Sequence, residues 1–179
     1  MFFAHLPAGY LLTHWLAKKF NFPKYWWIAV AGSVLPDLDM LYFFFIDNRQ
    51  TFHHEYWSHR PLVILTLALT TALVFYVFKQ KNLLIISMIF FANIFLHLAL
   101  DSIASTILWL YPWSTAGIGL FAVSEKYSFW MFNYIFHWTF FFEIGVMVVT
   151  AFLFFKRLRF GVRKPALDYV KYSRYDKNA

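Results

Sequence analysis

The sequence predicts an all-α integral membrane protein, a polytopic bundle of about five membrane helices. Of the 179 residues, 61% are hydrophobic, 24% aromatic and 14% charged, whereas a soluble domain usually carries about 25% charged residues. The 24 Phe and 8 Trp residues exceed what one small aqueous core can bury, so lipid is the expected solvent. The apolar residues form long runs separated by polar segments, which is typical of membrane helices.

The first two spans are expected over residues 2–19 and 25–46. The first is apolar and closes on two lysines, and Pro7 suits its first turn, where a missing N–H is tolerated. The second is interrupted at Gly32 and again at Pro36, so we expect the helix to be disturbed there.

Three further apolar spans follow a polar connector over residues 47–60. The second of these three is too long, at about 1.5 Å per residue, for one straight crossing, and we expect it to bend near Ser102–Ser105. The three spans are residues 61–78, 83 to about 110, and 129–155, with residues 111–128 as a loop or re-entrant segment.

Lysine and arginine gather at three places that define one side of the membrane. They lie at residues 18–24, 79–81 and 156–164, and the positive-inside rule assigns all three to the cytoplasm. The net charge of +7 is then explained without a nucleic-acid partner, and none is expected. The chain divides into a membrane helical domain, 1–155, and a basic cytoplasmic tail, 156–179, which could also touch anionic lipid.

This topology places several ionisable residues at one depth, on the side opposite the lysines. His97 and Asp101 lie about 21 and about 27 Å along the fourth span, near the outer end of a core of about 30 Å. Asp37 in the second span and His5 at the start of the first fall at a similar height. Residues 53–60, which read HHEYWSHR, form the outer loop. A polar pocket at the outer face is therefore predicted.

His97 and Asp101 have the spacing of a metal-binding pair. Residues four apart share one face of a helix, and ionisable side chains inside a membrane are costly and usually functional. A His–Asp hydrogen bond between two helices is the alternative explanation. The chain contains no cysteine, so His, Asp and Glu must supply any ligands. The ligands predicted for a divalent metal, with zinc favoured, are His5, Asp37, His54, His59, His97 and Asp101.

Asp37, Asp39 and Arg60 are the predicted catalytic residues. Pro36 breaks the helix there, and irregular backbone at membrane depth implies a polar cavity. One carboxylate can then bind the metal, while the other orients a ligand or accepts a proton from water. A cap or turn after the proline is the alternative. Arg60 could hold a phosphate or carboxylate, or pair with a nearby acidic side chain.

Four other ionisable residues stay outside this set. His53 is adjacent to His54 and is expected behind the ligands, because neighbouring residues rarely aim at one point. His14 lies close to the cytoplasmic lysines and is excluded. His137 could be an extra ligand or a structural histidine, and Glu143 is interpreted as a protonated or paired core carboxyl.

The order of these motifs resembles that of the YdjM-type inner-membrane metal-dependent hydrolases. The resemblance runs from about residue 3 to 114. It is carried by AHLPAGY at residues 4–10, LPDLD at 35–39, a paired-histidine segment, H-x-x-x-D at 97–101, and LYPWS at 110–114.

The paired-histidine segment matches the family's pattern HRGxTHS in part. His54, Ser58 and His59 match its two histidines and its hydroxyl, while Glu55 and Arg60 replace its Arg and its final Ser. The order His, Asp, His, then H-x-x-x-D is also similar to that of zinc-dependent phospholipases C.

The resemblance implies a multi-pass protein of the bacterial inner membrane, with the site on the periplasmic side and the C-terminus in the cytoplasm. Together with the ligand depth, it implies hydrolysis of a lipid or lipid-linked ester, above all a phosphoester, by metal-activated water. Six ligands are too many for one tetrahedral catalytic zinc with an open position, so two ions are expected. The alternative is a non-enzymatic divalent-metal binding or transport protein, which should spread polar residues through the whole membrane depth.

Overall fold

The structure is a computed structural model that describes residues 3–19 and 26–161, and within these ranges it contains helices and no strand. This confirms the predicted all-α class. An isolated bridge joins Ile107 and Ile118. The helices are α1 (His5–Lys19), α2 (Trp26–Ala31), η1 (Leu35–Leu38), α3 (Asp39–Phe45), η2 (His53–Glu55), η3 (Trp57–His59), α4 (Pro61–Val77), α5 (Lys81–Ala104), α6 (Trp130–Ile135) and α7 (Thr139–Gly161).

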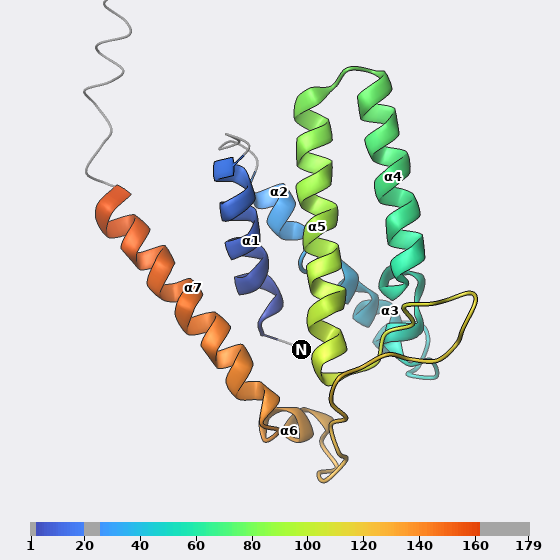
Figure 1. Ribbon diagram of the computed structural model, residues 1–179. Coiled ribbons are helices and arrows are strands. Elements are labelled where there is room, and N and C mark those ends of the chain that lie inside the picture. Colours follow the sequence, from blue (N-terminus) through green and yellow to red (C-terminus); the bar gives the residue numbers. More distant parts are fainter. Residues whose placement is uncertain (1–2, 20–25, 162–179) are drawn as a thin grey trace, which may run out of the picture.

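Helix α5 is the central helix of the bundle and lies between α1 and α4 (Figure 1). It contacts α1, α2 and α4, and α7 in turn contacts α1. Asn93 of α5 donates to Thr13 Oγ1 of α1 at 2.8 Å, while Ile94 and Leu98 pack on Ile64 of α4. The core of the bundle is therefore partly polar on the α1 side and apolar on the α4 side.

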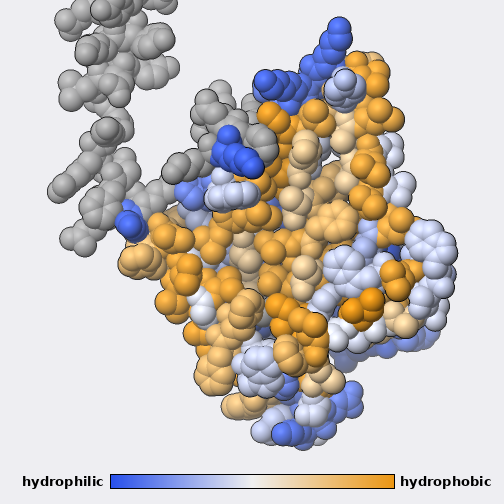
Figure 2. All heavy atoms as spheres, viewed as in Figure 1, coloured by the Kyte–Doolittle hydropathy of each residue, from blue (hydrophilic) through white to orange (hydrophobic). Residues whose placement is uncertain are grey.

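Two helices in the described ranges, α5 and α7, are long and apolar enough to cross a membrane. Helix α4 is also apolar but has 17 residues. The apolar stretch of α7 is only 11% buried within the protein, against 39% for α5. Its Phe141 and Phe152 are exposed, and Figure 2 shows a broad apolar surface, in orange, on the face that it draws. Such a surface suits lipid rather than water. The predicted total of five membrane helices stays a prediction.

Three of the predicted spans differ from the observed helices. Residues 25–46 are divided into α2, η1 and α3, because Pro36 lies in the first turn of η1 and lacks the N–H that would continue a helix. The long fourth span does not bend and continue to residue 110. It ends at Ala104, where the backbone N–H groups of Leu120 and Phe121 bond to carbonyls of its last turn. The last span is divided into α6 and α7 near His137.

The basic ends of the helices and the ionisable residues lie at opposite ends of the bundle (Figure 1). The end of α1, the α4–α5 connection and the end of α7 share one end, whereas His5 and the last turn of α5 lie at the other. This arrangement agrees with the common depth predicted for the polar residues. The direction of the bundle across the membrane stays a prediction. Residues 20–25 and 162–179, which include most of the predicted basic tail, lie outside the described residues.

The start of α1 is attached to α7 by a buried carboxylate. Glu143 has 0% exposure, and its Oε2 accepts the backbone N–H of Phe3 at 2.6 Å and of Ala4 at 3.0 Å. The first N–H groups of a helix lack partners within the helix, and negative charge there is stabilising. Glu143 is thus a paired core carboxyl that fixes the chain immediately before His5.

Replacing Glu143 by Ala is expected to destabilise the protein by roughly 1–3 kcal/mol, because two N–H groups lose their acceptor. Glu143→Gln should lose less, since its amide oxygen can still accept. The melting temperature in detergent measures the effect, and Glu125→Gln, which changes an exposed carboxylate, is the control. Equal melting temperatures for Glu143→Ala and the wild type would show that this contact does not hold α1.

Candidate metal centre

The structure brings all six predicted ligands to one end of the bundle. They come from five separate elements: His5 from α1, Asp37 from η1, His54 from η2, His59 from η3, and His97 and Asp101 from α5. The four histidines and Asp101 are each at most 5% exposed, and the Asp37 side chain is 29% exposed. The cluster is therefore enclosed, and Asp37 is its most accessible member.

Asp101 is the hub of the cluster. Its Oδ1 lies 3.0 Å from His5 Nε2, and its Oδ2 lies 3.0 Å from His97 Nε2. The Nε2 atoms of His54 and His59 each lie 3.7 Å from the same Oδ2. One carboxylate thus contacts four imidazoles from four elements.

Asp37 and the paired rings of His59 and His97 complete the inner part of the cluster. Asp37 Oδ1 lies 3.5 Å from His97 Nε2, which lies 3.4 Å from His59 Nε2. One ligand atom from each of these three residues and one from Asp101 all lie within 4.8 Å of one another. The His5 ring stacks on that of His97, with centroids 3.8 Å apart.

Outer contacts orient the two central histidines. His97 Nδ1 donates to the backbone carbonyl of Ser33 at 2.8 Å, and His59 Nδ1 donates to Asp39 Oδ2 at 2.8 Å. Carbonyl and carboxylate oxygens only accept, so each neutral ring carries its proton on Nδ1. In the neutral form that binds metal, each Nε2 atom offers a lone pair beside the other ring and beside the carboxylate of Asp101. This donor set fits a divalent cation, and the outer contacts are of the kind that orient metal-bound histidines.

His54 is held in a similar way, and it is neutral. Its Nδ1 lies 2.8 Å from Ser105 Oγ, just beyond the end of α5. Burial lowers the pKa of His54 to about 2, so the ring carries no charge at neutral pH. A neutral imidazole is the form that binds metal.

Asp39, a predicted catalytic base, lies one layer outside the cluster. Besides His59, it accepts a hydrogen bond from Ser58 Oγ at 2.5 Å, and His53 Nδ1 lies 3.5 Å from its Oδ1. Asp39 is thereby placed to orient His59. This is the second role considered for Asp37 and Asp39, in which one carboxylate orients a ligand. His53 contacts this outer carboxylate, and one ligand atom each from His53, His54 and His59 also lie within 4.8 Å of one another.

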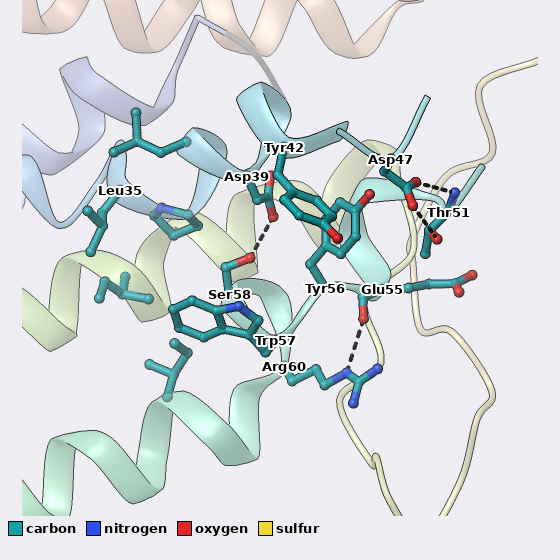
Figure 3. Close-up of a pocket in the computed structure, with 14 residues that line it drawn as sticks. Leu35, Asp39, Tyr42, Asp47, Thr51, Glu55, Tyr56, Trp57, Ser58 and Arg60 are labelled. Atoms are coloured by element: carbon teal, nitrogen blue, oxygen red, sulfur yellow. Dashed lines mark hydrogen bonds between the residues drawn. The ribbon is translucent and has the colours of Figure 1, made fainter. Parts of the chain in front are cut away.

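Arg60 is not brought to the cluster. Its Nε donates to the backbone carbonyl of Glu55 at 3.0 Å, and its guanidinium carbon lies 4.0 Å from the ring centroid of Tyr111. Figure 3 shows the side chain pointing away from Asp39 and Ser58. In this structure Arg60 therefore does not face the cluster, because Glu55 and Tyr111 hold the guanidinium.

Ser33 and Ser105, two groups behind the ligands, were not predicted from the sequence, whereas Ser58 belongs to the motif that carries the family resemblance. In the sequence, only the interruption at Gly32 indicates a role for Ser33. Helix α2 ends just before Gly32, so the Ser33 carbonyl accepts a hydrogen bond from His97. Gly9, in the AHLPAGY motif, lies against Ser33, and a Cβ at that position would clash with the serine side chain. His137, for which both a ligand and a structural role were considered, has its Nδ1 2.9 Å from Thr139 Oγ1.

Two cavities flank the cluster. The larger, of about 960 Å³, includes Asp39, Ser58 and Arg60 in its wall (Figure 3) and meets the cluster only through its outer layer. The smaller, of about 400 Å³, is lined by Asp37, His54 and Asp101 themselves. Access to the cluster is therefore through the smaller cavity.

Fold and cluster together define a class, a helical membrane protein that gathers histidines and aspartates in an enclosed site at one end of its bundle. The chain belongs to the YdjM inner membrane protein family, whose model matches residues 1–163. The suspected family is thus confirmed, and the family is one of inner membrane proteins. No match was found among curated proteins or among solved structures.

Proposed function

We propose that this protein is a membrane-embedded, metal-dependent hydrolase of a lipid or lipid-linked ester, with a phosphoester as the favoured substrate. The observation that carries the proposal is the arrangement of His59 and His97, whose Nε2 atoms face each other 3.4 Å apart beside two carboxylates. A cation stabilises such a set of electron-rich atoms, and zinc is a suitable cation because it binds imidazole nitrogens and carboxylate oxygens.

Two ions are the proposed content of the site. The carboxylate of Asp101 directs one oxygen to His5 and the other to His97, His54 and His59. A carboxylate with ligands on both sides is suited to bridge a pair of ions, and paired ions are common in enzymes that hydrolyse phosphoesters. Asp37, His59 and His97 would hold one ion with Asp101, and His5 would contribute to the other.

A bound divalent ion would supply a Lewis acid that activates water and polarises the ester oxygen. The protein would contribute the acceptor for the water proton, and the proposed acceptor is the carboxylate oxygen of Asp37 that does not bind the ion. Its carboxylate is the most exposed of the cluster and lines the smaller cavity, so a substrate can reach it. Asp39 would keep His59 in its tautomer through the contact to Nδ1.

A lipid substrate is supported by the surroundings of the smaller cavity. Met40, Phe43, Phe44 and Phe52 form much of its wall. Apolar walls with a few polar groups at the base are typical of ligand sites. An ester whose polar group reaches the cluster could therefore leave its chain against the aromatic wall.

The proposal is tested with full-length protein purified in detergent without chelator. We expect near-stoichiometric metal by elemental analysis, and hydrolysis of phosphatidic acid or of a polyprenyl phosphate that EDTA abolishes and zinc restores. Protein that holds no metal, or that hydrolyses these esters equally well in EDTA, would contradict the proposal. Metal uptake into proteoliposomes without any ester hydrolysis would favour a metal carrier instead.

A further inference from the structure

Arg49 lies in the wall of the cavity that reaches the cluster. The cavity of about 400 Å³ has Asp37, His54 and Asp101 among its lining residues, and among the described residues that line it Arg49 is the sole Lys or Arg. The guanidinium carbon lies 4.9 Å from the ring centroid of Phe44, another residue of the same wall. A cation–π contact of this kind keeps the charge beside the cavity.

The backbone at Arg49 has an unusual conformation. Asn48 and Arg49 have φ angles of 50° and 62°, in the left-handed region that residues other than glycine seldom adopt. The N–H of Arg49 bonds to the carbonyl of Phe43 at 3.0 Å, which fixes the turn after α3. Strained backbone of this kind is often found where a side chain is held for binding.

The positive charge of Arg49 would also favour the binding of an anion in this cavity. An anionic ester that approaches the base of the cavity meets the carboxylates of Asp37 and Asp101, and like charges repel. An arginine on the approach offsets this repulsion, and its planar fork can bond two oxygens of a phosphate at once. Arg60 cannot do so from its position, since it lines the other cavity and contacts Tyr111.

We infer that Arg49 and the apolar wall formed by Met40, Phe43 and Phe52 are a binding site for an amphiphilic phosphate, an anionic phosphate group attached to an apolar chain. Arg49 holds the phosphate oxygens, and the wall holds the start of the chain. The inference rests on the proposed function, because it places the substrate of the same metal centre. It adds the residue that selects anionic over neutral substrates.

The test measures binding, by microscale thermophoresis, of dodecyl phosphate, inorganic phosphate and neutral dodecanol to the detergent-purified full chain. We expect the wild type to prefer dodecyl phosphate over both other probes. Arg49→Ala should weaken dodecyl phosphate binding roughly 10- to 100-fold, as for loss of a charged hydrogen bond, and leave dodecanol unaffected. Arg49→Lys should fall between, because it keeps the charge but loses the fork. Arg60→Ala is the matched control and should bind as the wild type does.

Two results would overturn the inference. One is equal loss of dodecyl phosphate binding in Arg49→Ala and Arg60→Ala, which would show that the loss of either positive charge weakens binding to the same extent. The other is inorganic phosphate binding as tightly as dodecyl phosphate, which would remove the apolar wall from the site. Because binding is read without turnover, Arg49-dependent binding in a protein that hydrolyses no ester would support this site while refuting the hydrolase.

Discussion

Replacing Asp101 by Asn is expected to leave the protein without metal and its ester hydrolysis at background. Asn has the same shape, but it removes the negative charge that contacts four imidazoles. Among the residues that the structure describes, no other carboxylate is within reach to replace both of its oxygens, because Asp37 contacts the cluster from one side at 3.5 Å. Elemental analysis and hydrolysis of the best substrate measure the result.

The matched control for this substitution is Glu55→Gln. It also removes one carboxylate charge, one residue away from His54, from an exposed side chain. Metal content and activity should equal those of the wild type. Full metal content in Asp101→Asn would refute the metal centre at this place, whatever the activity.

Replacing Asp39 by Asn is expected to lower metal affinity and activity about 10- to 100-fold, the usual effect of removing a contact behind a metal-bound histidine. The amide can present N–H instead of oxygen to His59 Nδ1, which would disfavour the tautomer with a free Nε2. Binding itself should persist, because Asp39 is not within the inner cluster. A comparison of Asp39→Asn with Asp101→Asn therefore distinguishes the effect of the outer contacts on metal binding from that of the inner cluster.

A zinc titration with a competing chelator measures the affinity of Asp39→Asn. Ser58→Ala, which removes only the hydroxyl bonded to Asp39 Oδ2, should have a smaller effect. An affinity that is unchanged in Asp39→Asn would show that His59 needs no partner on Nδ1, or that His59 is not a ligand.

Several parts of this architecture could be predicted from the sequence. Composition predicted helices in lipid, and the lysine clusters predicted which ends of the helices lie together. Once those ends were assigned, the depth of His5, Asp37, His97 and Asp101 followed from the rise of a helix. Their meeting in the structure reflects that shared depth. Metal binding by these residues stays a prediction.

Other parts depend on tertiary contacts that no local pattern shows. Arg49 is an example: a role was predicted from the sequence for Arg60 alone, although both arginines lie in one polar connector. Which of them faces the cluster depends on the left-handed turn at residues 48–49 and on the position of Tyr111, which is 51 residues after Arg60. The end of α5 at Ala104 likewise depends on N–H groups from residues 120 and 121.

The interruption between α2 and η1 has a consequence for engineering. A designer who seeks thermostability would replace Gly32, Ser33 and Pro36 with alanine, since a helix former at an irregular position commonly raises the melting temperature. In a continuous helix, however, the carbonyl of residue 33 would accept from its own helix, and the imidazole of His97 would lose the acceptor that sets its proton. Variants at these positions that are selected for heat resistance should therefore have a higher melting temperature and a lower activity than the wild type.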